Sequence, residues 1–232
     1  MPGTTVAAWS AIVLLAVVVA GCNGRTVTTP ATSPQGTASA TSSSIPPASP
    51  PLVAAARAQI GVTLRYDPAY VVLPYPNGDV PQDRGVCTDV VIRALRTQGL
   101  DLQQRVHEDM QAHFEIYPKK WGLRAPDANI DHRRVPNLQV WFDRQGWSVP
   151  VTDRDDDYRP GDLVTWMLPG HLDHIGIVSD RRSPFTHAQL VLHNIGHGTR
   201  EDDILFAYPI TGHYRPDLPQ GGRVAAAAAA GR

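Results

Sequence analysis

One cysteine and two histidines of this sequence are of the types that nucleophilic catalysis requires. Cys87 lies in the stretch "DRGVCTDVVIRAL", where a helix is expected to begin. Unpaired backbone N–H groups and the helix dipole at such a position favour a thiolate. His174 and His193 lie farther along the chain, in two short apolar segments. A cysteine nucleophile needs a base that takes its proton and a polar group that orients this base, so these three residues are candidates for a catalytic site.

The second cysteine, Cys22, bears on whether Cys87 can form a disulfide. Residues 6–20, "VAAWSAIVLLAVVVA", are an apolar run too short to span a bilayer, which needs about 20 residues. The run ends in "VAGC" and resembles a bacterial lipoprotein signal, in which Cys22 becomes lipidated. A lipidated sulfur cannot pair with Cys87, which would leave a free thiol in an exported protein. A plain secretory signal or a membrane anchor is the alternative.

The composition changes along the chain and predicts one folded domain. Residues 23–51 contain eighteen Ser, Thr or Pro among 29 residues, which is typical of a disordered linker. The tail 218–232 has low complexity and ends in "VAAAAAAGR". We therefore expect a signal peptide at 1–22, a linker at 23–51, a folded domain at 52–217 and a tail.

The first half of the predicted domain is helical, and the second half consists of strands. Apolar spacing predicts helices over 52–60, 86–97, 102–114 and 136–145, with Asp101 capping the third and a Pro-rich loop over 65–82. Strands are expected over 163–168, 174–180 and 189–195, and one or two more within 204–215. Helices followed by a run of strands predict an α+β fold with an antiparallel sheet packed on helices.

The order of the motifs resembles a known family of enzymes. "VCTDVV", "PGDLVTW", "HIGIV" and "VLHNIG" occur in the order found in NlpC-type papain-like cysteine peptidases of bacterial cell walls. The resemblance implies the papain-like fold, with Cys87 as nucleophile, His174 as general base and His193 as the orienting residue. Asn194, next to His193, is the alternative orienting group. That family usually has Asp-Cys-Ser-Gly at the nucleophile, whereas this chain has Val-Cys-Thr-Asp.

A second resemblance covers nearly all of residues 57–215. "GVCTDVVIRAL", "NIDHRRVPNL", "GDLVTW", "HIGIVSD" and "ITGHYR" together are similar to the exported bacterial proteins called domain of unknown function 1287. This resemblance supports an exported domain and implies no particular reaction.

A buried structural cysteine and a metal site are the alternatives to a nucleophile. Free thiols are often simply buried in protein cores. His171, His174, His193 and His197 fall within a short stretch, and histidine is a common zinc ligand. The His171–His174 spacing does not suit one strand face, and the sequence has no HExxH-like helix. We therefore expect no metal and no cofactor.

The overall charge indicates which partners to expect. The chain has 21 Lys and Arg against 22 Asp and Glu, so it lacks the basic surface of nucleic-acid-binding proteins. His132, Arg133 and Arg134 stand in a row and could bind the carboxylates of a peptide substrate, although a solvated loop is the plainer interpretation. Tyr75, Asp89 and Asn194 are further candidates for contact with the substrate, and Trp121 and the tyrosines of 65–75 could line the same groove.

These observations predict a cell-envelope enzyme. We expect a monomeric, lipid-anchored hydrolase that cleaves amide bonds of peptidoglycan peptides as an endopeptidase or amidase. A non-catalytic envelope binding module on the same fold, or an acyltransferase using the same residues, is the alternative.

Overall fold

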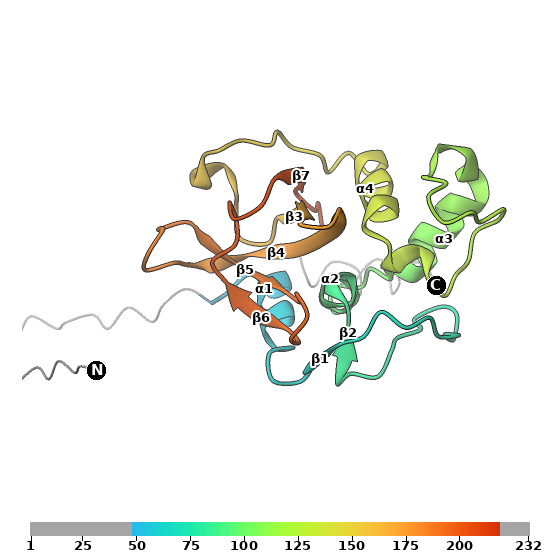
Figure 1. The fold of residues 1–232 in the computed structure, drawn as a ribbon, viewed down its shortest axis with the longest axis horizontal. Coiled ribbons are helices and arrows are strands. Elements are labelled where there is room, and N and C mark those ends of the chain that lie inside the picture. Colours follow the sequence, from blue (N-terminus) through green and yellow to red (C-terminus); the bar gives the residue numbers. More distant parts are fainter. Residues whose placement is uncertain (1–47, 219–232) are drawn as a thin grey trace, which may run out of the picture. The chain divides into compact units, whose positions relative to one another are not determined.

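The computed structural model describes residues 48–218, which fold into helices followed by a sheet (Figure 1). The first half contains α1 (Pro51–Arg57), β1 (Arg65–Tyr66), β2 (Arg84–Gly85), α2 (Cys87–Arg96), α3 (Leu102–His113), η1 (Phe114–Ile116), η2 (Asp131–Arg133) and α4 (Val135–Arg144). The second half contains η3 (Asp155–Asp157), β3 (Leu163–Leu168), β4 (Leu172–Arg182), β5 (Gln189–His193), β6 (Arg200–Asp202) and β7 (Ile210–Tyr214). The predicted α+β class is confirmed.

The main sheet is antiparallel, with five strands in the order β6-β5-β4-β3-β7. In the central pair, Leu163 of β3 lies opposite Ile177 of β4, and Trp166 lies opposite His174. Strands β1 and β2 form a separate two-residue parallel pair next to the start of α2. The sheet therefore brings the "GDLV", "HIGIV" and "VLHNIG" segments into adjacent strands.

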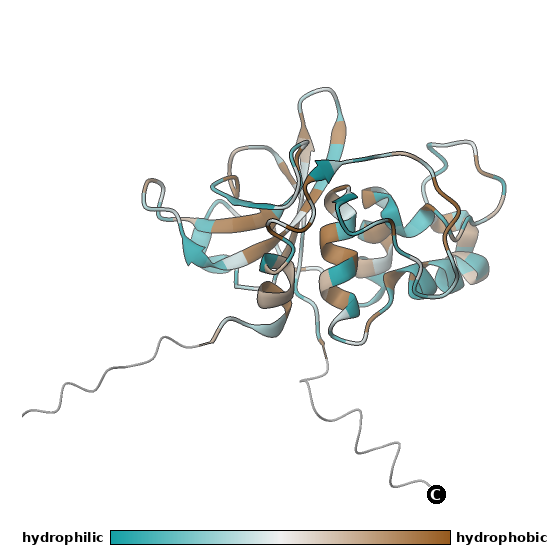
Figure 2. Ribbon diagram, turned by 90° about the horizontal axis from the view of Figure 1, so that it is seen from below, coloured by the Kyte–Doolittle hydropathy of each residue, from teal (hydrophilic) through white to brown (hydrophobic). Residues whose placement is uncertain are grey.

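The two faces of the sheet have different coverings. Ile175, Ile177 and Leu192 belong to a core cluster with α1, α2, α3 and α4, whereas Val178 and Val191 belong to a second cluster with Trp166. Side chains alternate between faces along a strand, which explains this division. Figure 2 shows apolar segments on both the helices and the strands where the two layers meet.

Local sequence signals explain where the helices begin and end. The Asp101 carboxylate accepts a hydrogen bond from the Gln103 backbone N–H at the start of α3, as predicted. Pro136 lies in the first turn of α4, and Gly146 follows its end with a φ of 72°. Val90, Val91, Ala94 and Leu95 form the buried stripe of α2.

Two boundaries differ from those predicted, and one strand was not expected. Helix α1 ends at Arg57, and turns replace its predicted last residues. Residues 204–209 form turns, so β7 begins only at Ile210. Strand β6 was not predicted, because its three residues "RED" have no apolar alternation and pair only because β5 lies beside them.

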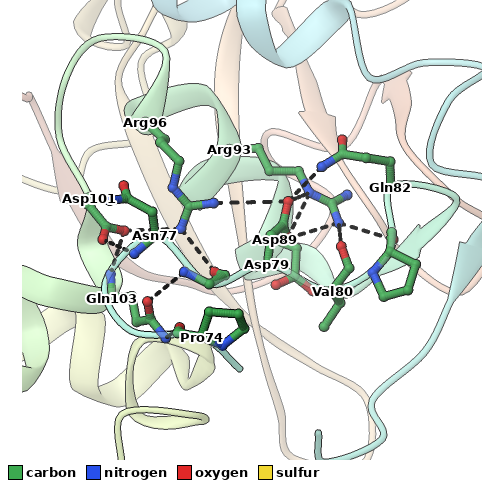
Figure 3. Close-up of polar contacts among 12 residues, drawn as sticks. Pro74, Asn77, Asp79, Val80, Gln82, Asp89, Arg93, Arg96, Asp101 and Gln103 are labelled. Carbon is green, nitrogen blue, oxygen red and sulfur yellow. Dashed lines mark hydrogen bonds and ion pairs between the residues drawn. The ribbon is translucent and has the colours of Figure 1, made fainter. Parts of the chain in front are cut away.

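Most of the predicted 65–82 loop lacks regular structure, and a polar network attaches it to α2 and α3 (Figure 3). Arg93 of α2 forms an ion pair with Asp79, with Nε and Oδ2 2.9 Å apart, and also donates to the Val80 carbonyl. Gln103 of α3 donates to the Pro74 carbonyl at 2.9 Å. The loop therefore has a defined position beside the second half of α2 and the start of α3.

Several predictions concern residues outside the described range. The signal peptide with Cys22, the linker up to residue 47 and the tail from residue 219 lie there. Among residues 48–218, none of the helices has the length and apolar character needed to cross a membrane.

Candidate functional site

The candidate site lies where β4 and β5 stop pairing. Their pairing ends at Ile177 and Leu192, and the next residues toward the start of β4 have no ladder partner in β5. The Val178 N–H bonds to the Asp162 carbonyl on the β3 side. Backbone N–H groups alternate in direction along a strand, so the Ile175 N–H points the other way, toward the side of β5. We call this place the β4–β5 split.

The start of α2 meets both strands at the β4–β5 split. The side chain of Asn194, directly after β5, donates from Nδ2 to the Gly85 carbonyl at 3.0 Å. The Ile175 backbone N–H interacts with the Cys87 thiol and favours its ionised form. Cys87 is the first residue of α2, so one contact at Gly85 and one at Cys87 itself hold the nucleophile candidate against the sheet.

Burial dominates the protonation of this thiol. Burial, with a smaller contribution from the nearby Asp89 carboxylate, raises the pKa of Cys87 to about 12. The N–H groups of Ile175, Thr88 and Cys87 itself oppose this increase. The N–H groups of the helix start therefore favour the thiolate, as expected, but desolvation of the charge exceeds their effect, so the thiol is protonated in the free protein.

His174 and His193 lie beside each other on the sheet face that carries Trp166. Their ring centroids are 5.3 Å apart with an interplanar angle of 89°, and the ring of His174 lies 5.8 Å from that of Trp166. Residues alternate between faces, which puts both histidines on the opposite face from Ile175. Cys87 thus approaches the split from the helix side, and the histidines approach it from the other side.

Both histidines are buried and hold no proton charge at neutral pH. Burial, with a smaller contribution from the nearby His193, lowers the pKa of His174 to about 3. Burial lowers the pKa of His193 to about 4, although the Asp202 carboxylate opposes this shift. Nε2 of His193 lies 3.2 Å from Oδ2 of Asp202, close enough for an ion pair but outside hydrogen-bond geometry. Nε2 of His174 has no hydrogen-bond partner among the described residues.

Cys87 lines an open pocket of about 390 Å³. The other walls come from the β1 region, the 120–136 segment and the β3–β4 turn, with Tyr66, Pro68, Val86, Lys120, Trp121, Ile130, Arg133, Arg134, Val135, Pro136, His171, Leu172 and Asp173. A larger hollow of about 800 Å³ borders α3 and α4, and none of its described lining residues is Cys or His. The pocket at Cys87 is therefore the candidate site because it contains a nucleophile candidate, although the other hollow is larger.

The pocket carries cations and aromatic rings at its rim. The Arg134 guanidinium lies 4.2 Å from the Trp121 ring centroid and pairs with Asp131 at 3.3 Å. Lys120 lies 3.4 Å from Asp173, and both contribute to the wall. The structure thus brings one of the three predicted basic residues, Arg134, to a partly exposed position in the pocket.

Other predicted substrate-binding residues are engaged elsewhere. Arg133 forms a buried, two-bonded ion pair with Asp89, in which the nitrogen–oxygen distances are 3.0 and 2.9 Å. His132 is buried outside the pocket wall, and burial lowers its pKa to about 3. Tyr75 is exposed and packs edge-on against His107, at 5.2 Å between ring centroids.

The four histidines of the metal alternative are divided between different surroundings. His171 lines the pocket at a turn and His197 is exposed, whereas His174 and His193 are buried. Within residues 48–218, no group of three or more His, Cys, Asp or Glu side chains has an arrangement that could hold a metal ion.

Comparison with known proteins gives the family of this chain. The sequence profile described as "Domain of unknown function (DUF1287)" matches residues 53–216. The chain belongs to the DUF1287 family. It is also 58% identical over 160 residues to the uncharacterized protein YijF of Escherichia coli (strain K12), covering 69% of this chain and 78% of that protein. The DUF1287 match spans the whole site, from β1 to β7, and neither description states an activity.

Sequence reasoning missed one feature of the site in this DUF1287 domain. Asp202 approaches His193 only because β6 pairs with β5, and its "RED" segment has no strand signal. Tyr66, one of the tyrosines expected to line the groove, does line the pocket together with Trp121. Burial, with Cys87 and Asp89 nearby, raises the pKa of Tyr66 to about 12.

Proposed function

We propose that this protein is a thiol-dependent amide hydrolase with Cys87 as nucleophile, His174 as general base and His193 as the residue that orients His174. The observation that carries the proposal is the β4–β5 split. A helix-start cysteine lines an open pocket there, next to the strand that bears His174. Nε2 of His174 has no partner among the described residues. Because the histidines and Cys87 approach from opposite sides of the sheet, the proposed mechanism requires the proton to pass through the β4–β5 split, beyond the end of the strand pairing.

The proposed mechanism begins with both groups neutral. Because burial raises the pKa of Cys87 and lowers that of His174, proton transfer accompanies the attack rather than preceding it. The sulfur bonds to the amide carbonyl carbon, and the Cys87 backbone N–H helps to stabilise the oxyanion. His174 then gives its proton to the leaving amine. Water activated by His174 hydrolyses the thioester and restores the thiol.

The same proposal includes a papain-like fold and a peptide substrate. The helix-start cysteine packed against a sheet that carries two histidines supports the papain-like, NlpC-type fold. The pocket rim, with Arg134, Lys120 and Trp121, suits an extended peptide that carries carboxylates. We therefore propose peptidoglycan peptides as the substrate class, and an envelope location with lipid at Cys22 as the membrane attachment.

The test is digestion of purified peptidoglycan sacculi, with released fragments identified by mass spectrometry. The wild-type protein should release peptide fragments, and Cys87→Ala should lower the rate by about a thousandfold or more, because no other group replaces the nucleophile. Thermal unfolding of Cys87→Ala serves as the control for its fold. Release of the same fragments by folded Cys87→Ala would rule out the mechanism.

One observation favours a second candidate, a non-catalytic peptide-binding module on the same fold. A thiol whose pKa lies near 12 is almost entirely protonated at neutral pH and is a weak nucleophile by itself. The binding module predicts that peptidoglycan fragments bind at the pocket without being cleaved. Fragment binding that is lost in Arg134→Ala, together with no turnover by the wild-type protein, would support it. Transfer of an acyl group to an amine instead of water would identify an acyltransferase.

A further inference from the structure

Arg133 connects three segments around the start of α2. Its guanidinium forms two bonds with the Asp89 carboxylate, and the pair is almost completely buried. The same guanidinium lies 3.4 Å from the Ala69 carbonyl and 3.5 Å from the Asp67 carbonyl. The Arg133 carbonyl accepts a hydrogen bond from the Thr88 hydroxyl at 3.1 Å. The residue therefore links η2, the loop after β1 and the first turn of α2.

Asp89 is the other half of this arrangement and acts on the turn that carries Cys87. Its Oδ2 accepts the Val86 backbone N–H at 2.6 Å, which is the bond that begins the helix. The carboxylate lies so close to Gly85 that a Cβ there would come within 2.9 Å of Oδ2. Cys87 thus follows a turn held by Asp89 on one side and by Asn194 on the other.

Several polar groups face the thiol from the elements around it. Asp89 comes from its own helix, Arg133 from η2, Tyr66 from β1 and the Ile175 N–H from β4, beside the buried His174. The His174 ring and the Tyr66 phenol are neutral at neutral pH, because burial shifts the pKa of each away from 7. Lys120, Arg134 and Asp173 also line the pocket, at its rim, so Asp89 and Arg133 are the opposed charges that are almost completely buried.

We propose that the Asp89–Arg133 ion pair positions Cys87 and controls how readily its thiol ionises. Asp89 disfavours the thiolate, and Arg133 holds the carboxylate in place and carries the opposite charge, which acts against that effect. Neither residue touches the reacting atoms, so both are positioning residues. This inference rests on the proposed function only in taking Cys87 as the reacting group.

The test is the rate at which iodoacetamide alkylates Cys87 at about pH 8, where the rate follows the thiolate fraction. Asp89→Asn keeps the shape of the side chain and removes its charge, so the rate should rise about tenfold, equivalent to one pKa unit. Arg133→Gln leaves the carboxylate uncompensated, so the rate should fall by a similar factor. Opposite signs are the decisive result, because a merely loosened turn would expose the thiol and raise the rate in both variants.

A matched control comes from another ion pair, which the same helix forms with the 65–82 loop. Asp79→Asn disturbs the Arg93–Asp79 ion pair, which lies farther along α2, and should leave the alkylation rate within about twofold of wild type. Thermal unfolding of each variant establishes that it is folded. If Arg133→Gln does not fold, Arg133→Lys, which keeps the charge, should alkylate within about threefold of wild type. An Asp89→Asn rate equal to that of Asp79→Asn would overturn the proposal.

Alkylation of Cys87 requires no peptide substrate. The role of the Asp89–Arg133 ion pair and the proposed hydrolase activity can therefore be tested independently. Opposite rate changes without any cleavage of sacculi would support the role of the ion pair and contradict the hydrolase. Cleavage that depends on Cys87, combined with unchanged alkylation in Asp89→Asn, would support the hydrolase and contradict the role of the ion pair.

Discussion

At Cys87 and His174, burial decides the protonation state. Each residue alone could supply a reactive form near neutral pH, since a helix start favours a thiolate and an ordinary imidazole titrates near 6.5. In the fold both are desolvated, which favours the neutral form of each. A neutral thiol beside a neutral imidazole predicts general-base catalysis, in which the proton moves as the sulfur attacks.

The pH dependence of peptide cleavage tests this resting state. The neutral imidazole of His174 is the active form, and its pKa of about 3 keeps it neutral throughout mildly acidic conditions. We therefore expect kcat/KM to change less than about twofold between about pH 7.5 and 5.5. An ordinary histidine would lose about tenfold activity over the same range. A midpoint near pH 6.5 in the kcat/KM profile, with the protein still folded, would contradict the assignment.

Among the elements, the contact between α2 and the β4–β5 split determines the site. Strands β4 and β5 must approach closely before the split, and Gly176 of the "HIGIV" motif makes this approach possible. A Cβ at Gly176 would come within 2.6 Å of Val191 Cγ1, 3.0 Å of the Leu192 carbonyl and 3.2 Å of His193 Cβ. A side chain at this position would therefore push β5, and with it His193, away from β4.

Gly176→Ala should reduce both stability and activity. Overpacking typically costs about 1–3 kcal/mol, which chemical denaturation would measure as a lower free energy of unfolding. Displacement of His193 should lower kcat more than it raises KM. The double variant Gly176→Ala/Val191→Ala removes the closest contact and should recover part of the stability. Full activity and stability in Gly176→Ala alone would show that the strands can separate without cost.

Among the histidines buried within residues 48–218, three are held neutral by burial, His132 at one place and His174 beside His193 at another. Burial lowers the pKa of His132 and His174 to about 3 and that of His193 to about 4. In the unfolded chain each takes up a proton near pH 6.5, whereas in the fold each stays neutral. The unfolded state therefore binds more protons below about pH 6.5, so stability falls as the pH falls.

This proton balance predicts an acid-labile domain. Full uptake of three protons on unfolding would lower the free energy of unfolding by about 4 kcal/mol for each pH unit between about pH 6 and 4. Denaturant titrations at a series of pH values measure this slope. His132→Asn, which lies outside the pocket wall, should reduce the slope by up to about a third. Stability that stays constant from about pH 7 to 4.5 would contradict the burial of these rings as neutral groups.

Local signals by themselves determined the helices α1 to α4, the strands β3, β4, β5 and β7, and their order. The Asp101 cap, the Pro136 start and the Gly146 end are short-range effects, and strand 163–168 follows from its own β-branched run. The sequence also identified Cys87, His174 and His193 as candidates, because residue type and motif order do not depend on the rest of the fold.

The tertiary structure alone decided how these residues are surrounded. Arg133 pairs with Asp89 across 44 positions of sequence, so residues expected to contact the substrate form a buried ion pair instead. Strand β6, and with it Asp202 beside His193, forms only because β5 is present as a template. The desolvation of Cys87 depends on all the elements packed around it, which come from distant parts of the sequence. It therefore could not be predicted from the residues near Cys87 alone. For this reason the order of the sequence motifs indicated that Cys87 is a nucleophile, and only the tertiary structure showed that its thiol is neutral in the free protein.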